Sequence, residues 1–247
     1  MGNALTNGAT ITVVKTGASY HTLDDWGLAI SNNDYIDDPD IDTNYVFIPG
    51  RSDFIDLSEV VAGKPVYTKR KINIKLGGVR ERLQWDNDIS SIRNKIHGQL
   101  VQIIFDNDPN YYWQGRCEVV KFDRFRELGE FEINIDTASP FKWATVDSAD
   151  SWLWDPFDFE DGIIPGFSSI DVNNETLYIP VGDLPINPII KVNSMVTATL
   201  VVSWDAESET ITHTGEYRFP NMWLYDNAPV TFTGEANITI TYRSASL

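Results

Sequence analysis

Apolar and polar side chains alternate along residues 66–76, and the apolar face carries three residues, Ile72, Ile74 and Leu76. Successive side chains of a strand point to opposite faces of a sheet, so this pattern predicts a half-buried strand. Residues 129–137 alternate in the same way and predict a second strand of this kind, in a hairpin with residues 120–125. The pattern here is therefore that of antiparallel β structure.

A different period is present at about residues 84–97, where the apolar positions recur at i, i+4, i+7 and i+11. These positions are Trp85, Ile89, Ile92 and Ile96. They form one stripe on an α-helix, and Gly98 can end the helix in a left-handed conformation. This is the one helix that the sequence predicts.

The segment after this helix predicts a strand at 100–105, a turn built by Asp106, Asp108 and Pro109, and an aromatic return strand. The spacing of Asp106 and Asp108 is similar to the start of a calcium loop. That alternative fails, because Tyr111 stands at loop position six, where glycine is needed, and no glutamate stands at position twelve. We therefore predict that the segment is a structural strand–turn–strand unit and not a binding or catalytic site.

Residues beyond 167 contain short strand-like runs separated by turn residues at intervals of roughly 8–12 residues, which is typical of an all-β sandwich. The charge also changes along the chain. Residues 1–143 hold 16 Lys+Arg and 21 Asp+Glu, a net charge of −5, whereas residues 144–247 hold 3 and 15, a net charge of −12. The shift predicts two domains, 1–143 and 144–247.

The overall net charge of −17, without a basic stripe, argues against nucleic-acid binding. No run of about 18 apolar residues exists, so no membrane span is predicted. The N-terminus lacks a basic region followed by a long apolar core, so we expect no signal peptide and synthesis in the cytoplasm.

Candidate chemistry is sparse. The single cysteine, Cys117, excludes an intrachain disulfide and fits a small buried residue better than a catalytic thiol. His97 fits a residue of the last helical turn or a buried hydrogen-bond donor, with a metal ligand or general base as the alternative. No nucleophile, phosphate-loop or metal-ligand motif is present. We therefore predict no enzyme, no cofactor and no metal.

Aromatic side chains alternate by two over part of residues 152–159. Exposed aromatics such as Trp152 and Trp154 could stack on sugar faces, which makes them predicted carbohydrate contacts. The alternative is a linker strand whose aromatics dock into a core.

The order of these pieces resembles the distal tail protein (Dit) family of long-tailed, non-contractile phages. The resemblance is carried by YIDDPDIDTNYVFIPGRSDFIDLSE, VYTKRKINIKL, IRNKIHGQLVQIIFDNDPNYYWQGRCEVVKF and FEINIDTASPFKW. It covers residues 20–143 closely and 144–247 more loosely. It implies a mainly β protein: an N-terminal β-rich belt domain with one helix and a C-terminal galectin-like β-sandwich.

The resemblance also implies a virion structural protein at the distal end of a tail, in the tail tip or baseplate. It implies a homohexameric ring that joins the tail-tube protein to the tail-tip hub protein and supports host adsorption, with a receptor-binding protein as a further partner. The alternative function is a carbohydrate-binding adhesin domain at the host surface. We predict ring contacts in an acidic loop, through Tyr35, Asp37, Asp38 and Asp40.

Overall fold

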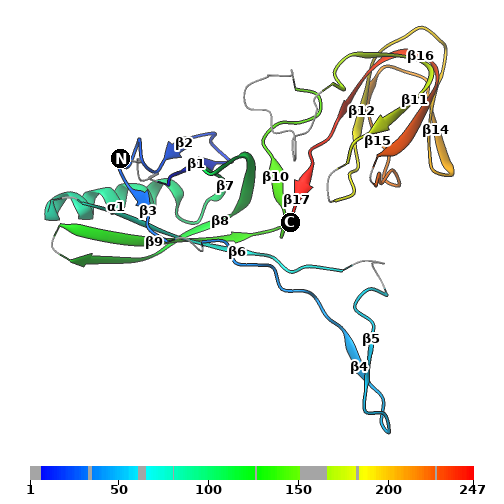
Figure 1. Cartoon of the computed structure of the whole chain (residues 1–247). Helices are drawn as coiled ribbons and strands as arrows, with labels where there is room; N and C mark the ends of the chain where they lie inside the picture. The colour runs from blue at the N-terminus through cyan, green and yellow to red at the C-terminus, as the bar shows by residue number, and fades with distance from the viewer. Residues whose placement is uncertain are drawn as a thin grey trace, which may run out of the picture. The chain divides into compact units, whose positions relative to one another are not determined.

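The computed structural model describes residues 7–32, 35–60, 65–79, 81–125, 127–150, 166–181, 184–225 and 227–247. The chain separates into two compact units, Met1–Lys142 and Trp143–Leu247, and each is described by itself. The predicted fold class is confirmed: antiparallel strands dominate both units, and one α-helix lies among the described residues (Figure 1). No helix in the described part of the chain is long and apolar enough to span a bilayer.

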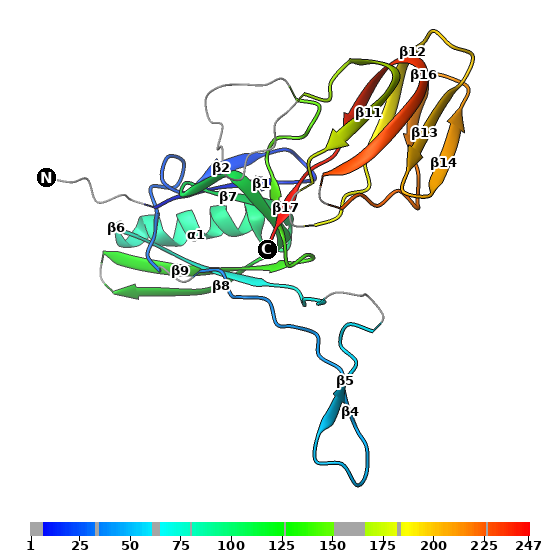
Figure 2. The same ribbon diagram turned by 45° about the vertical axis from the view of Figure 1, so that its right-hand side comes forward.

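The first unit contains a sheet whose strands follow the order β2-β1-β7-β8-β9-β6-β3. The strands are β1 (Ala9–Val13), β2 (Ser19–His21), β3 (Ala29–Ile30), β6 (Lys71–Val79), β7 (Leu100–Phe105), β8 (Asp108–Phe125) and β9 (Leu128–Thr137). In β6 the residues with buried side chains are Ile72, Ile74 and Leu76, as the alternating pattern predicts. In both views of the ribbon the sheet curves around the helix (Figures 1 and 2).

Strand β8 is longer than the sequence predicts. The aromatic return strand and residues 120–125 form one strand of 18 residues instead of two. A register shift between Val119 and Lys121 lets β8 stay paired with β9 across the break in the apolar period. The turn before β8 is also shorter than expected, because Phe105 pairs with Asp108 and only two residues lie between them. Pro109 therefore lies in the strand, and placing it in the turn was wrong.

Helix α1 spans Arg82–Ile96, starting two residues before the predicted range and ending one residue before its end. Its predicted stripe of Trp85, Ile89, Ile92 and Ile96 is buried. The helix ends because His97 takes an extended conformation (φ −63°, ψ 128°) and Gly98 has a φ of +73°. Positive φ is available to glycine at no steric cost, which explains the glycine at this position.

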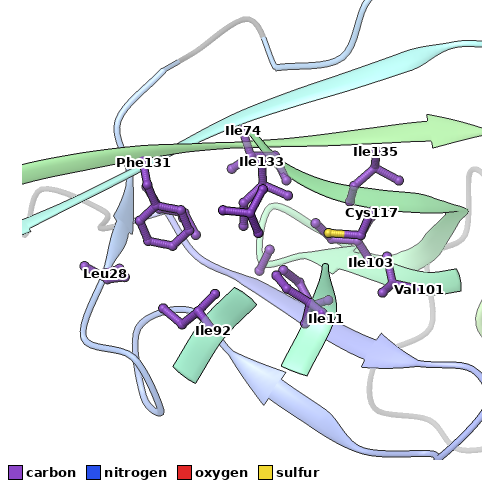
Figure 3. Close-up of a cluster of buried hydrophobic side chains, with 14 of the residues drawn as sticks. Ile11, Leu28, Ile74, Ile92, Val101, Ile103, Cys117, Phe131, Ile133 and Ile135 are labelled. Carbon is purple, nitrogen blue, oxygen red and sulfur yellow. The ribbon is translucent and has the colours of Figure 1, made fainter. Parts of the chain in front are cut away.

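The core of the first unit lies between α1 and the curved sheet. Figure 3 shows Ile92 of α1 facing side chains from β1, β6, β7, β8 and β9. At one end of this core Trp85 is fully buried, and its Nε1 donates a hydrogen bond to the Glu127 carbonyl at 3.0 Å. A Cβ on Gly129 would lie 2.5 Å from the Trp85 ring, so β9 approaches the helix this closely only with glycine there.

The second unit contains a six-stranded antiparallel sheet in the order β14-β13-β16-β12-β15, with β11 also paired to β16. The strands are β11 (Ile170–Ile179), β12 (Ile189–Met195), β13 (Leu200–Trp204), β14 (Glu207–Ile211), β15 (Gly215–Arg218) and β16 (Ala228–Thr241). Strand β16 joins two of the predicted short strands into one of 14 residues that pairs with β11, β12 and β13. The galectin-like character of this unit stays a prediction.

Two short strands, β10 (Lys142–Ala144) and β17 (Ala245–Ser246), pair with each other. Ser148 is fully buried beside them and connects three backbone groups. Its hydroxyl donates to the Ile240 carbonyl at 2.8 Å and accepts from the Tyr242 N–H at 2.9 Å, while its N–H donates to the Tyr242 carbonyl. This serine fixes the residues that follow β10 against the end of β16.

Candidate assembly surface

The segment between β3 and β6 contains a hairpin that we call the arm, residues 36–70. Its two legs are joined near the sheet by the Thr68 N–H donating to the Asp40 carbonyl and the Asp42 N–H donating to the Val66 carbonyl, both at 2.8 Å. An isolated bridge between Ile36 and Ile72 marks its origin at β6. The arm therefore begins as a continuation of the strand pairing of the body.

The far end of the arm is a separate two-stranded sheet of β4 (Tyr45–Phe47) and β5 (Phe54–Asp56). Phe47 lies directly opposite Phe54, with ring centroids 5.7 Å apart. Gly50 follows Pro49 and has a φ of +90°, which is the conformation that the third position of a type II turn requires, and the Arg51 N–H donates to the Ile48 carbonyl. The arm thus has a defined end and is not an irregular loop.

An ion pair lies at the same end of the arm. The Arg51 guanidinium holds both carboxylate oxygens of Asp53, at 3.1 Å and 2.7 Å. This bidentate contact lowers the pKa of the Asp53 carboxyl below its usual value. Asp56 is similarly held by the Ser58 hydroxyl and N–H, which lower its pKa. Both carboxylates therefore stay charged at the end of the arm.

Every residue from 41 to 54 is exposed. This run includes large apolar side chains on both faces of the hairpin: Ile41, Tyr45, Val46, Phe47, Ile48 and Phe54. An isolated two-stranded hairpin is marginally stable in water, and contiguous exposed apolar surface typically marks an interaction site. The arm is the strongest candidate for a functional surface in the described part of the first unit.

The sequence predicted contacts slightly upstream of this surface. Tyr35 is buried in the body, where its ring packs on Phe105 at 4.5 Å between centroids and its hydroxyl is hydrogen bonded to the Asn107 amide. Asp37, Asp38 and Asp40 are exposed near the root of the arm. The acidic run predicts a contact in this loop, but the unbroken apolar run Tyr45–Ile48 is the better indicator of an exposed contact surface. A half-buried strand alternates, and this run does not.

Trp152 and Trp154, the predicted carbohydrate contacts, lie outside the described residues. Two other tryptophans of the second unit differ in exposure. Trp204 is buried in its sheet, whereas Trp223 is 48% exposed. Tyr225 is also exposed, two residues further along the chain, and the intervening Leu224 is buried and bridged to Ile186. The structure therefore provides an exposed aromatic pair that the sequence did not separate from the buried tryptophans.

The residues whose types would suit a catalytic or metal site have structural roles. His97 caps the C-terminal end of α1, in line with the expected place at the helix end. The other reading, a buried donor, is wrong, because the side chain is exposed and its Nδ1 accepts a hydrogen bond from the Val119 N–H at 3.0 Å. Arg116 donates to the Gly98 carbonyl at 3.0 Å. Among the described residues, no group of three or more His, Cys, Asp and Glu side chains could hold a metal.

One contact was not predicted. His21 Nε2 lies 3.1 Å from Asp106 Oδ1, and His21 Nδ1 accepts from the Asp24 N–H at 3.2 Å. The pair joins the end of β2 to the β7–β8 turn. His21 has no hydroxyl or thiol hydrogen-bond partner in the part of the chain that the structure describes, so this His–Asp contact is not a nucleophile-activating arrangement.

Cys117 lies in β8 with its side chain in the core (Figure 3). Burial, reinforced by Glu118, raises the pKa of its thiol from 9.0 to about 12. The thiol is therefore protonated and unreactive near neutral pH, since the thiolate is the nucleophile. A raised pKa favours the folded state below pH 9 and this contribution is lost as the pH rises from 9 towards 12.

We expect this thiol to resist labelling. At pH 8 the thiolate fraction of native Cys117 is roughly a thousandfold below that of the unfolded chain, since the pKa is about 12 instead of 9.0. Ellman's reagent should therefore give no signal in the native state and one thiol per chain in urea. Because the chain has one cysteine, rapid labelling of the native protein would contradict this expectation directly.

The fold defines a class: a mainly β chain with one helix, a curved sheet that carries a hairpin arm, and a second antiparallel unit. Neither the models of known protein families nor the sequences of curated proteins match this chain. Among solved structures, the chain is similar to the crystal structure of the Dit protein (gp 19.1) of phage SPP1, with a TM-score of 0.66 and 12% sequence identity. The match covers 97% of this chain and 99% of that one, so this chain has a Dit-like fold over nearly its whole length.

Proposed function

We propose that this chain is a structural component of a long, non-contractile phage or prophage tail. It forms a homohexameric ring at the distal end of the tail, in the tail tip or baseplate. The SPP1 protein is described as a paradigm of the hub adsorption apparatus in phages that infect Gram-positive bacteria. Similarity in fold over nearly the full length of both chains supports a related role here.

The observation that carries the proposal is the arm. Exposing the apolar side chains on both faces of this hairpin to water is unfavourable. The exposure therefore indicates that another surface covers the hairpin. A contact between the arm of one copy and a different surface of the next is heterologous, and such contacts close into a ring when the rotation fits. Aromatic side chains that are exposed in a free subunit are often buried at the centre of the interface once the subunits assemble, where aromatic residues are enriched.

The ring would join the tail-tube protein to the tail-tip hub protein and support a receptor-binding protein during host adsorption. The role is non-enzymatic, and the structural roles of His97, Asp106, Arg116 and Cys117 support that part of the proposal. The ring-forming role belongs to residues 1–143, and residues 144–247 form the galectin-like unit. Asp37, Asp38 and Asp40 remain proposed ring contacts, because their carboxylates are exposed beside the root of the arm.

The test is light scattering behind size exclusion, on the chain alone and after incubation with the tail-tube or hub protein encoded with it. We expect a mass of six copies, alone or in the complex. Negative-stain images should show rings. A chain that stays monomeric in all three samples would contradict the proposal.

A carbohydrate-binding adhesin domain is the second candidate, and one observation favours it. Trp223 and Tyr225 are two aromatic residues close in sequence that are both exposed, 48% and 58% respectively. Flat aromatic faces can stack on the apolar faces of sugar rings. The net charge of −12 over residues 144–247 favours a neutral glycan over an anionic one.

Glycan-array binding separates the two candidates. If the chain is an adhesin, Trp223→Ala should weaken binding of a neutral glycan at least about fivefold, because stacking of a ligand on one aromatic ring is worth about 1 kcal/mol or more and about 1.4 kcal/mol corresponds to tenfold. Trp152→Ala and Trp154→Ala test the residues predicted from the sequence. Tyr178→Ala, at an exposed aromatic of β11, is the matched control. Absence of binding to every glycan would remove this candidate and leave the ring proposal unaffected.

A further inference from the structure

Arg70 is the last residue of the arm and immediately precedes β6. Its backbone is fixed on both sides by Thr137 of β9. The Arg70 N–H donates to Thr137 Oγ1 at 3.0 Å, and the Arg70 carbonyl accepts from the Thr137 hydroxyl at 2.9 Å and from the Thr137 N–H at 3.1 Å. Thr137 is itself 1% exposed. The position of Arg70 is therefore set by the sheet and not by the arm.

The side chain of Arg70 is unusual for a charged residue. Arg70 is only 8% exposed, and its guanidinium carbon lies 5.1 Å from the centroid of the Trp113 ring. Its Nε is buried without a hydrogen-bond partner, and no carboxylate of the described residues lies within ion-pair distance of the guanidinium. Burial lowers the pKa of Arg70, although the group stays charged at neutral pH.

Two cations near Arg70 are paired, whereas Arg70 is not. Lys69 contacts Asp136, and Lys142 contacts Asp108 at 2.8 Å. Asp38, on the outgoing leg of the arm, is near enough to favour the charged form of Arg70 but is not in contact with it. Burying an unpaired ion costs several kcal/mol, and stacking on an aromatic ring returns about 0.5–2 kcal/mol. Arg70 is thus buried and stacked on an aromatic ring, with no carboxylate of the described residues in contact with it.

We infer that the Arg70 guanidinium, seated on Trp113, receives a carboxylate from a second copy of this chain when copies assemble. The planar fork of Arg matches the two oxygens of a carboxylate. Arg70 lies at the root of the arm, so it is continuous with the surface proposed to form the ring. A second copy also offers the right charge, since the chain carries 36 Asp and Glu against 19 Lys and Arg. The inference rests on the proposed ring.

The test compares Arg70→Met with the wild type. Methionine keeps the apolar stem over Trp113 and removes the charge, so the melting temperature of the monomer should stay the same or rise. The concentration at which half of the chains are assembled should rise at least about tenfold, because the partner's carboxylate is left buried and unpaired. Arg70→Gln is a second variant in case methionine disturbs folding. Arg93→Met, at an exposed arginine of α1, should assemble like the wild type.

Two outcomes would overturn the inference without touching the ring. In the first, Arg70→Met assembles at the wild-type concentration. In the second, Arg70→Met and Asp38→Asn each lower the melting temperature of the monomer and the double variant lowers it no further, which would place the ion pair within one chain. By contrast, a wild-type chain that never assembles, with or without tube and hub proteins, would remove the ring itself.

Discussion

Aspartate at both Phe47 and Phe54 should leave the protein folded and abolish its assembly. The two rings face each other across the end of the arm and are 57% and 60% exposed, so the folded monomer loses little when they are replaced. In an interface they would be buried, and two carboxylates there would be desolvated without partners. Buried aromatic anchors contribute about 2 kcal/mol or more each, so we expect the dissociation constant to rise more than about a hundredfold.

Sedimentation velocity over a concentration series measures this effect, and circular dichroism checks that the melting temperature is unchanged. Val196→Asp is the matched control, because Val196 is an apolar residue of the second unit that is 71% exposed. It should assemble like the wild type. Rings formed by the double aspartate variant at wild-type concentrations would show that the arm is not the interface.

The second large effect is on folding. Trp85→Ala should lower the free energy of unfolding of the first unit by about 3–5 kcal/mol, the range for deleting a buried aromatic ring. Trp85 is fully buried, packs 5.5 Å from the Phe122 ring centroid and satisfies the Glu127 carbonyl. Urea unfolding should therefore show an earlier transition. Trp223→Ala, at the half-exposed tryptophan of the second unit, should change the unfolding free energy by about 0.5 kcal/mol or less.

A double-mutant cycle makes this prediction specific to the contact between α1 and β9. Gly129→Ala alone should be strongly destabilising, since its Cβ would lie 2.5 Å from the Trp85 ring. In a Trp85→Leu background the smaller side chain leaves room, so the additional cost of Gly129→Ala should fall. Strictly additive effects would contradict the steric account.

The elements that the sequence predicts well are those in which one local period decides burial. Trp85, Ile89, Ile92 and Ile96 share one face of a helix, and all four are buried against the sheet. Strand β6 follows the same logic with a period of two. Strand β8 does not, because the register shift near Val119 interrupts the period while pairing with β9 continues. A local pattern cannot distinguish such a bulge from the end of a strand.

The candidate surfaces were harder to predict because they depend on what lies beside a residue in space. Tyr35 sits in an acidic run yet is buried, since Phe105 and Asn107 come from a distant hairpin. Arg70 belongs to a Lys-Arg-Lys run that is typical of a solvated face, and only its placement over Trp113 buries it. Phe47 and Phe54 are of a residue type that is usually buried in a core, yet both are exposed here. Their exposure follows from the absence of neighbouring strands, which composition does not record.

The position of β1 in the sheet has a consequence for the order in which the first unit folds. Ala9 pairs with Phe105 and Val13 with Val101, so the main partner of β1 is made only after α1 and the strands β2 to β6. Helix α1 and the β8–β9 hairpin can form from nearby residues, whereas β1 must wait until β7 has been made. Long-range pairing of this kind slows folding. The strand β1 therefore stays without its main partner until residues 100–105 have been made.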